Sequence, residues 1–319
     1  MMHKEIIHFL KKSYPNYISG EEISRALKLS RAAIWKYMQE LRKEGYEIVA
    51  VPHLGYRLVS SPDKLFPHEI QFELGTKTLG QRIIYEDTVG STMDLAFQLA
   101  MKNVAEGTVV CAESQTKGRG RLGRGWVSPK GKGIYFSMIL RPKLPPAEVA
   151  KLTLLCGVAV SEAIKKMTGL EALIKWPNDL LIGSKKVAGI LTELNAEMDR
   201  VKFVIVGIGI NVNTSAQQLP PEATSLRLVK KLSLSRVMVF QEILREVEKW
   251  YLEAQHHGFS KVLKRWKELS LTLGKWVKVS DPSGVFEGEA ISIDHDGGLL
   301  IRQDSGVVVK KMAGDVIAA

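Results

Sequence analysis

Cysteine is nearly absent from this chain, which has two, Cys111 and Cys156, among 319 residues. Both lie in apolar surroundings, and neither has a Cys-x-x-Cys partner or a histidine neighbour. The sequence therefore predicts two buried reduced thiols rather than a disulfide framework or a cysteine-based metal site. No metal site formed by the chain alone is expected.

Long apolar runs are also missing. No stretch approaches the roughly 20 apolar residues of a membrane-spanning helix. His3, Lys4, Glu5 and His8 interrupt the first apolar stretch, unlike the core of a signal peptide. The hydrophobic content of 45% is that of a folded protein, and the length predicts two or three domains. We therefore expect a cytoplasmic protein.

Acidic residues are lacking in one region. The net charge is +11, and residues 117–143 contain eight Lys or Arg and no Asp or Glu. Residues 1–60 form a second basic region, with ten basic against six acidic residues. Such an excess favours polyanionic partners, either nucleic acid or nucleotide phosphates. Two separate basic regions predict two separate functions.

The first basic region has the pattern of a winged helix-turn-helix. Ser19 followed by Glu22 is a capping box, Ser30 is an N-cap for "RAAIWKYMQELRKEG", and Gly45 ends that helix. The following "YEIVAVPHLGYRLVS" has two β-prone runs joined around residues 52–55, which predicts a hairpin. Two short helices, a tight turn and such a hairpin make up the winged motif.

In a winged helix-turn-helix the second helix of the motif enters the major groove. We therefore predict DNA contacts from Arg31 and Lys36, with Arg57 of the wing touching phosphate. The alternative is a small helical docking module whose basic residues are only a solvated face.

The chain after the winged motif is predicted to form two further domains. A polar, proline-interrupted connector lies near residues 60–80. Beyond it, β-prone runs alternate with three helical patterns, and several strands follow one another as hairpins. This predicts an α+β multidomain protein whose central mixed sheet carries helices on one face. From about Thr272, short strands and tight turns predict an SH3-like barrel. The predicted domains are 1–62, 63–270 and 271–319.

The second basic region is centred on "TKGRGRLGRGW", residues 116–126, hereafter the glycine–arginine loop. Because β-prone runs flank it on both sides, a free nucleic-acid arm or a disordered spacer is disfavoured. Glycine leaves amide groups uncovered, and arginine offers a planar fork that matches phosphate or carboxylate. Because like charges this dense repel one another, we predict a loop that is mobile when empty and orders over an anionic ligand. Walker A and dinucleotide-binding patterns are both incomplete in this chain.

Five stretches follow the winged motif in a fixed order: "GSTMD" (90–94), "ESQTKGRGRLGRGW" (113–126), "KWPNDLLI" (175–182), "KKVAGIL" (185–191) and "GIGINVN" (207–213). Over essentially its whole length the chain resembles the bifunctional biotin-protein ligases that also repress the biotin operon. The resemblance implies a class II synthetase-like central domain. The resemblance implies that biotin and ATP, with Mg²⁺, form biotinyl-5'-AMP, and that biotin passes to a lysine of a carrier protein such as the acetyl-CoA carboxylase carrier subunit. It also implies a homodimer that, when loaded with the adenylate, represses biotin genes at operator DNA.

The resemblance also assigns site residues. Contacts to biotin or biotinyl-AMP are implied for Ser91, Thr92, Met93, Gln115, Arg119, Gly120, Arg121, Lys186 and Gly189. The adenylate pocket is implied for Trp126, Asn178, Gly207, Gly209 and Asn211. Met93 stands where Asn often follows "ST", a departure from the family pattern that leaves the hydroxyls of Ser91 and Thr92 in place. Trp35 stands where a polar residue is expected in the recognition helix, so operator preference is expected to differ.

The chemistry of adenylation fits these residue types. Attack of a carboxylate on the α-phosphate brings two anions together, so Lys186, Arg119 and Arg121 are predicted to neutralise the charge. An ordered loop would also keep water from a mixed anhydride. Asp179 is the candidate to assist the carrier's lysine in losing its proton.

Two other functions stay open. A non-catalytic, metabolite-sensing repressor would have no use for Lys186 together with the glycine–arginine loop. A lipoate or octanoyl ligase leaves "GRGRLGR" unexplained.

Overall fold

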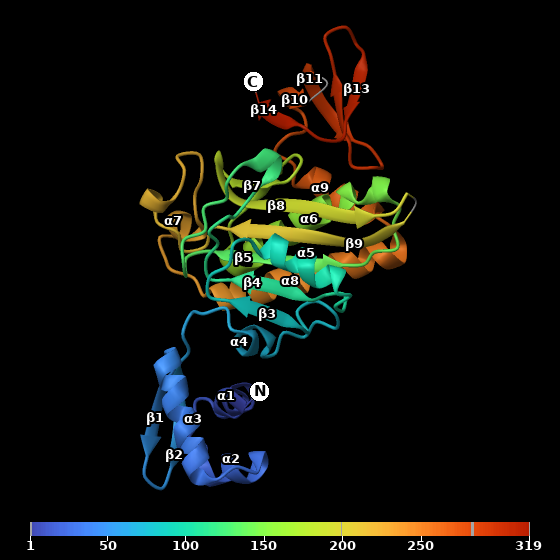
Figure 1. Cartoon of the computed structure of the whole chain (residues 1–319). Helices are drawn as coiled ribbons and strands as arrows, with labels where there is room; N and C mark the ends of the chain where they lie inside the picture. The colour runs from blue at the N-terminus through green and yellow to red at the C-terminus, as the bar shows by residue number, and fades with distance from the viewer. Residues whose placement is uncertain (1, 199, 282–283, 319) are drawn as a thin grey trace. The chain divides into compact units, whose positions relative to one another are not determined.

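The computed structural model describes residues 2–198, 200–281 and 284–318. They form two compact units, Met1–Glu73 and Leu74–Ala319 (Figure 1). The boundary lies within the polar connector of residues 60–80. No helix in the described ranges is long and apolar enough to cross a membrane.

The amino-terminal unit is a winged helix-turn-helix, as predicted. Its elements are α1 (Met2–Ser13), α2 (Gly20–Leu27), α3 (Arg31–Glu44), β1 (Glu47–Val51), β2 (Gly55–Ser60) and α4 (Pro67–Gln71). Both predicted N-caps are present, since the side chains of Ser19 and Ser30 accept hydrogen bonds from Glu21 N and Ala33 N. Gly45, with φ 106°, ends α3 in the left-handed region that glycine tolerates.

One core holds this unit together, with apolar residues from all three long helices and from the hairpin. The helix α4 is fixed to the unit by polar contacts. The Glu69 side chain, only 3% exposed, accepts hydrogen bonds from Lys11 Nζ at 2.6 Å and from the Tyr46 hydroxyl at 2.7 Å. A buried carboxylate needs such partners, so α4 packs with the elements that precede it.

The second unit is built on a seven-stranded mixed sheet. Its strands are β3 (Ile83–Glu86), β4 (Val109–Ala112), β5 (Ile134–Leu140), β6 (Leu173–Lys175), β7 (Asp179–Ile182), β8 (Lys185–Ala196) and β9 (Val201–Ile210). The spatial order is β3-β4-β5-β9-β8-β7-β6. β3 and β4 are parallel, and all other neighbours are antiparallel. The mixed sheet and its hairpins confirm the prediction.

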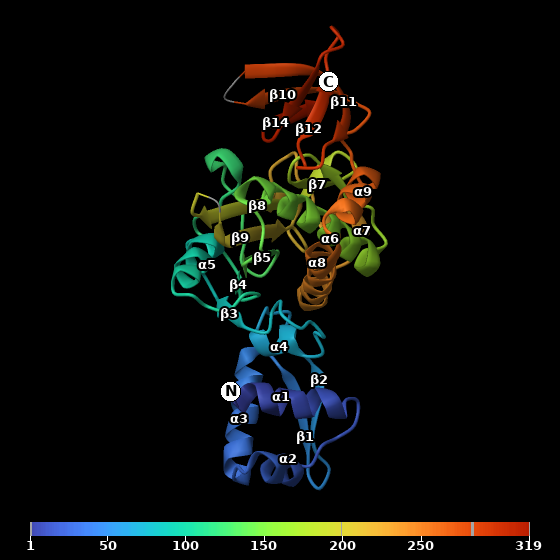
Figure 2. The same ribbon diagram turned by 90° about the vertical axis from the view of Figure 1, so that its right-hand side faces the viewer.

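Helices cover both faces of this sheet, not one face as expected. They are α5 (Thr92–Met101), α6 (Ala150–Thr168), α7 (Leu226–Lys230), α8 (Arg236–His257) and α9 (Ser260–Glu268). Phe136 of β5 packs against Phe240 of α8, with ring centroids 4.6 Å apart. Ile139, an odd number of residues further along β5, joins a cluster with Met93 of α5, so α5 lies on the opposite face (Figure 2). The prediction was wrong because helical periodicity shows only that a helix buries one of its sides. It does not show which face of a sheet the helix covers.

The carboxy-terminal part of the second unit is an antiparallel sheet of five short strands, the content expected for an SH3-like domain. They are β10 (Trp276–Asp281), β11 (Gly284–Ile293), β12 (Leu299–Arg302), β13 (Val308–Lys311) and β14 (Asp315–Ala318), in the order β13-β12-β11-β10-β14. The "KWPND" turn is tied to this part. Trp176 donates its backbone N–H to Thr272 Oγ1 at 2.9 Å and its indole N–H to the Gly297 carbonyl at 3.2 Å.

Candidate active site

A cavity of about 440 Å³ lies in the second unit. Every residue assigned by the resemblance to the ligand or to catalysis lines it: Ser91, Thr92, Met93, Gln115, Arg119, Gly120, Arg121, Trp126, Asn178, Asp179, Lys186, Gly189, Gly207, Gly209 and Asn211. Other lining residues were given no individual role by the sequence, among them Arg124, Lys175 and Leu219, and Asp315 was missed altogether.

Glycines of β8 and β9 form the floor. Gly189 and Gly209 are direct partners across the two strands. A Cβ on Gly209 would lie 2.4 Å from the Trp126 ring, and a Cβ on Gly207 would lie 2.4 Å from Met93 Sδ. The indole and the thioether therefore lie directly against the sheet because these positions have no side chain.

A chain of hydroxyl and amide groups forms one polar end. The Thr92 backbone N–H and hydroxyl both donate to Gln115 Oε1, at 2.9 and 3.1 Å. The Gln115 amide donates in turn to Ser128 Oγ at 3.1 Å, and Thr92 Oγ1 lies 2.8 Å from Ser137 Oγ. Ser91, before them, caps α5 by accepting from Met93 N. Nothing in the local sequence marks Ser128 or Ser137, because only the sheet register brings them here.

The glycine–arginine loop is folded into a tight turn. The Gly120 N–H donates to the Arg124 carbonyl at 2.7 Å, and Trp126 N–H donates to the Gly118 carbonyl at 2.8 Å. A single 3-10 turn, Arg121–Gly123, lies between them. A Cβ on Gly118 would lie 2.6 Å from the Trp126 carbonyl, so this glycine is required by close packing.

Arg119 is held by two carboxylates from other elements. Its guanidinium contacts Asp94 Oδ1 of α5 at 2.5 Å and Glu193 of β8 at 3.1 Å. Burial acts to lower the pKa of Arg119, but the hydrogen bonds to Asp94 and Glu193 outweigh it, so this pKa lies above its usual value. The charge repulsion expected from the loop sequence is therefore compensated in part by residues far away in the chain.

The other two loop arginines reach toward β7 and β14. Arg121 donates to Asn178 Oδ1 and to the Gly314 carbonyl, both at 3.2 Å. Burial lowers the pKa of Arg121, which matches a guanidinium that has neutral partners here. Arg124 forms an ion pair with Asp315.

Lys186 projects into the cavity beside the indole. Its Nζ lies 2.7 Å from Asp179 Oδ1 and 5.4 Å from the centroid of the Trp126 ring. The neighbouring Lys185 is exposed. Of the two lysines in "KKVAGIL", the second is therefore the one that lines the cavity.

Buried polar atoms without a hydrogen-bond partner among the described residues include two on one wall of the cavity: Trp126 Nε1, a donor, and Asn211 Oδ1, an acceptor. Buried polar groups normally find partners, so this wall is suited to a flat ligand that carries both an acceptor and a donor. Nearby, Asn178 is fully engaged, since its amide also donates to the Ile190 carbonyl at 2.8 Å.

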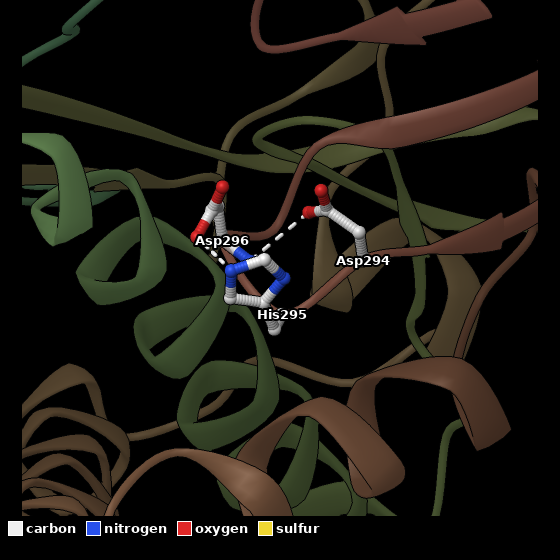
Figure 3. Close-up of side chains that lie close together, drawn as sticks. All are labelled: Asp294, His295 and Asp296. Carbon is white, nitrogen blue, oxygen red and sulfur yellow. Dashed lines mark hydrogen bonds and ion pairs between the residues drawn. The ribbon is translucent and has the colours of Figure 1, made fainter.

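A second group of titratable side chains lies on the carboxy-terminal sheet: Asp294, His295 and Asp296 (Figure 3). The Asp294 carboxylate accepts from the backbone N–H groups of Asp296 and Gly298, each at 3.0 Å. Lys310 forms ion pairs with both aspartates. The group is therefore accounted for as a hydrogen-bonded turn neutralised by a lysine.

The predicted DNA-contacting residues are at the surface of the amino-terminal unit. Arg31 forms an exposed ion pair with Glu21 at 2.7 Å, and Lys36 is exposed. The Arg57 guanidinium lies 4.7 Å from the centroid of the Tyr17 ring.

Three family models match the chain in the predicted order. The HTH domain matches residues 3–57, the biotin/lipoate A/B protein ligase family matches residues 85–211, and the biotin protein ligase C terminal domain matches residues 272–318. Each matched segment corresponds to one part of the predicted architecture.

Known proteins match over most of the chain. The bifunctional ligase/repressor BirA of Bacillus subtilis is 44% identical over 96% of this chain and 95% of its own length. The BirA of Escherichia coli is 31% identical over 93% and 92%. Among solved structures, biotin protein ligase from Aquifex aeolicus in complex with biotin and ATP is 32% identical, with a TM-score of 0.65, over 75% of this chain and 100% of that one. The chain belongs to the family of the bifunctional ligase/repressor BirA proteins.

Proposed function

We propose that this protein is a biotin-protein ligase that forms biotinyl-5'-AMP from biotin and ATP, transfers biotin to a carrier lysine, and represses transcription. The main support is the single cavity that brings two loop arginines, Lys186 and a hydroxyl–amide chain together. The Aquifex relative, solved with biotin and ATP, supports the same pair of substrates.

Biotin would lie along the α5 face. Its ureido ring needs both donors and acceptors, which Thr92 and Gln115 supply through groups already aligned by their mutual hydrogen bonds. Its carboxylate would extend toward the cationic groups of Arg119, Arg121 and Lys186. Adenine would occupy the wall of Trp126 and Asn211, where its ring nitrogens and amino group satisfy the two unpaired atoms.

In the first step, a biotin carboxylate oxygen attacks the α-phosphorus, and the bond from that phosphorus to the pyrophosphate oxygen breaks. Lys186 and Arg121 stabilise the charge that moves onto the pyrophosphate. The glycine–arginine loop excludes water from the mixed anhydride. Asp179, in contact with Lys186 Nζ, holds that ammonium in place.

In the second step, the carrier's lysine amine attacks the acyl carbon, AMP leaves, and the amine loses a proton. A role for Asp179 in taking that proton remains a prediction. Lysine of a carboxylase carrier protein is the acceptor that the family implies.

Mg²⁺ would accompany ATP. Hard cations of this size bind one or two carboxylates together with substrate phosphates. Asp179 lines the cavity, but its carboxylate is paired with Lys186 Nζ, so the ion would be held mainly by the substrate phosphates. The ion would neutralise part of the negative charge on the phosphates of ATP.

The winged helix-turn-helix would bind operator DNA, with Arg31 and Lys36 at base edges and Arg57 at phosphate. A homodimer loaded with the adenylate is the repressing form we propose, and the cytoplasm is the location we predict.

Biotin-dependent exchange between ATP and pyrophosphate tests the ligase function. Lys186→Ala should lower the exchange rate by about 100-fold or more, the cost of removing one stabilising donor, whereas exposed Lys185→Ala should change it less than about twofold. Lipoate should not replace biotin. No stimulation by biotin, a better response to lipoate, or equal effects of the two substitutions would reject the proposal.

A further inference from the structure

Trp35 is an exposed aromatic residue on α3, the predicted recognition helix, and no interaction described above uses it. Its exposed fraction is 59%. The buried residues of α3 are Ile34, Met38 and Leu41, which face the core of the amino-terminal unit. Trp35, one residue after Ile34, lies about 100° around the helix from this buried face and is exposed to solvent.

The face of α3 that carries Trp35 is exposed and contains two basic residues. Arg31, Ala32, Trp35 and Lys36 are all exposed, and positions 31/35 and 32/36 are neighbours on the helix surface. The ion pair between Arg31 and Glu21 holds that guanidinium to one side of the helix. The small side chain of Ala32 leaves the indole as the largest projecting group in the first turns of α3.

These first turns are the part of a recognition helix that meets base edges. An indole has no bidentate hydrogen-bonding edge with which to read guanine or adenine, but it presents a broad apolar surface. The apolar group that the major groove displays is the C5-methyl of thymine. The flanking cations are suited to a polyanion rather than to an apolar protein surface.

We infer that Trp35 is a specificity-determining residue that packs on a thymine methyl group in the operator. The inference rests on the proposed repressor function, because it requires DNA in contact with α3. The operator should therefore contain a thymine whose methyl group, rather than its hydrogen-bonding edge, is read.

The test uses the full-length protein with biotin and ATP. A preferred duplex is first selected from random DNA, and each of its thymines is then replaced singly by uracil, which removes only the methyl group. We expect one replacement per half-site to weaken binding of the unsubstituted protein by about fourfold, the value for burying one methyl-sized group. Trp35→Ala should bind the selected duplex more weakly and be insensitive to that replacement.

Tyr14→Ala is the matched control, because Tyr14 is 61% exposed and lies outside α3. It should keep the fourfold sensitivity. Unchanged hydrogen-exchange protection of the α1 and α3 amides in Trp35→Ala will show that the amino-terminal unit of the variant is folded. If every uracil replacement is neutral, or if Trp35→Ala keeps the sensitivity, the inference is wrong while the repressor function stands. If no DNA is enriched, the repressor function and the inference fail together.

Discussion

At the residue scale, the shape of the cavity depends on glycines, which have no side chain, as much as on the residues whose side chains line it. Gly209 lies beneath the Trp126 indole, and its position on β9 leaves no free space above the strand. A glycine in a strand interior normally weakens the strand. Here its presence is explained by the close approach of the aromatic ring to the backbone.

Gly209→Ala should therefore displace the indole. Overpacking of this kind costs about 1–3 kcal/mol, and since the indole borders the proposed adenine site, the cost should appear as weaker ATP binding. We expect the KM for ATP in pyrophosphate exchange to rise about tenfold. Gly90→Ala is the control, because a Cβ there meets nothing within 4 Å. An unchanged KM for ATP in Gly209→Ala would show that Trp126 does not border the nucleotide.

His68 predicts a pH dependence in the amino-terminal unit. Burial lowers the pKa of His68 from 6.5 to about 4, with a further contribution from Lys11. The Tyr46 hydroxyl donates to Glu69, so it accepts from neutral His68, whose Nε2 lies 2.6 Å away. Because the folded-state pKa is depressed, the unfolded chain binds the proton more readily between these values. This stabilisation is present above pH 6.5 and is lost toward pH 4.

The expected loss is roughly 1–3 kcal/mol for this half-buried ring. Hydrogen exchange of the full-length protein can measure it, with protection factors for the α1 and α4 amides compared at pH 7 and pH 5. His68→Gln should remove most of the difference. Equal pH dependence in the variant would assign the effect to other groups.

The polar residues that complete the site could not be predicted from the sequence. Resemblance and residue chemistry pointed to the cavity-lining arginines and Lys186, because each lies in a recognisable motif. Asp94, Glu193 and Asp315, which pair with the loop arginines, belong to three different elements. Only the folded sheet brings them to one loop, and isolated acidic residues give no local signal.

At the element scale, local signals predicted the helices and strands well. Serine N-caps marked α2 and α3, Gly45 marked the end of α3, and β-prone runs marked the strands, because these features depend on neighbouring residues. The position of α5 on the opposite face of the sheet was not predictable. That choice depends on β4, β5 and β9, to which α5 is packed.

The glycine–arginine loop is the element whose behaviour the sequence addressed most directly. Charge repulsion predicted mobility without ligand, yet Asp94 and Glu193 provide Arg119 with two partners. We expect Asp94→Asn together with Glu193→Gln to release the loop. Trypsin cleavage within residues 117–124 should then be about tenfold faster without ligand, since the loop amides lose their fixed geometry.

Biotin with ATP should restore protection in this double variant, because the ligand provides replacement anions. Glu197→Gln is the control, since Glu197 pairs with Lys202 at 2.7 Å and not with the loop. Cleavage rates that are equal in the double variant and the parent would mean that these ion pairs do not hold the loop.

At the scale of the whole molecule, the connector of residues 60–80 is held in two parts. The amino-terminal unit holds its first part, and the second unit holds its last part. Glu69 of α4 is bound by Lys11 and Tyr46 of the amino-terminal unit. The chain from Leu74 onward is instead fixed by α8. Arg245 Nε donates to the Leu74 carbonyl at 2.9 Å, and the Glu248 carboxylate accepts from the N–H groups of residues 77–79. Folding should therefore divide between residues 73 and 74.

Two truncations test this division, one beginning at Asp63 and one at Leu74. Both should lose operator binding and keep some ligase activity, with melting temperatures that agree closely. In the longer protein, α4 has lost Lys11 and Tyr46, so chymotrypsin should cut after Phe72 and convert it to a fragment close to the shorter one. In the full-length chain the same bond should be cut much more slowly. If residues 63–73 stay protected after truncation, the catalytic unit itself holds α4, and the boundary lies nearer to residue 62.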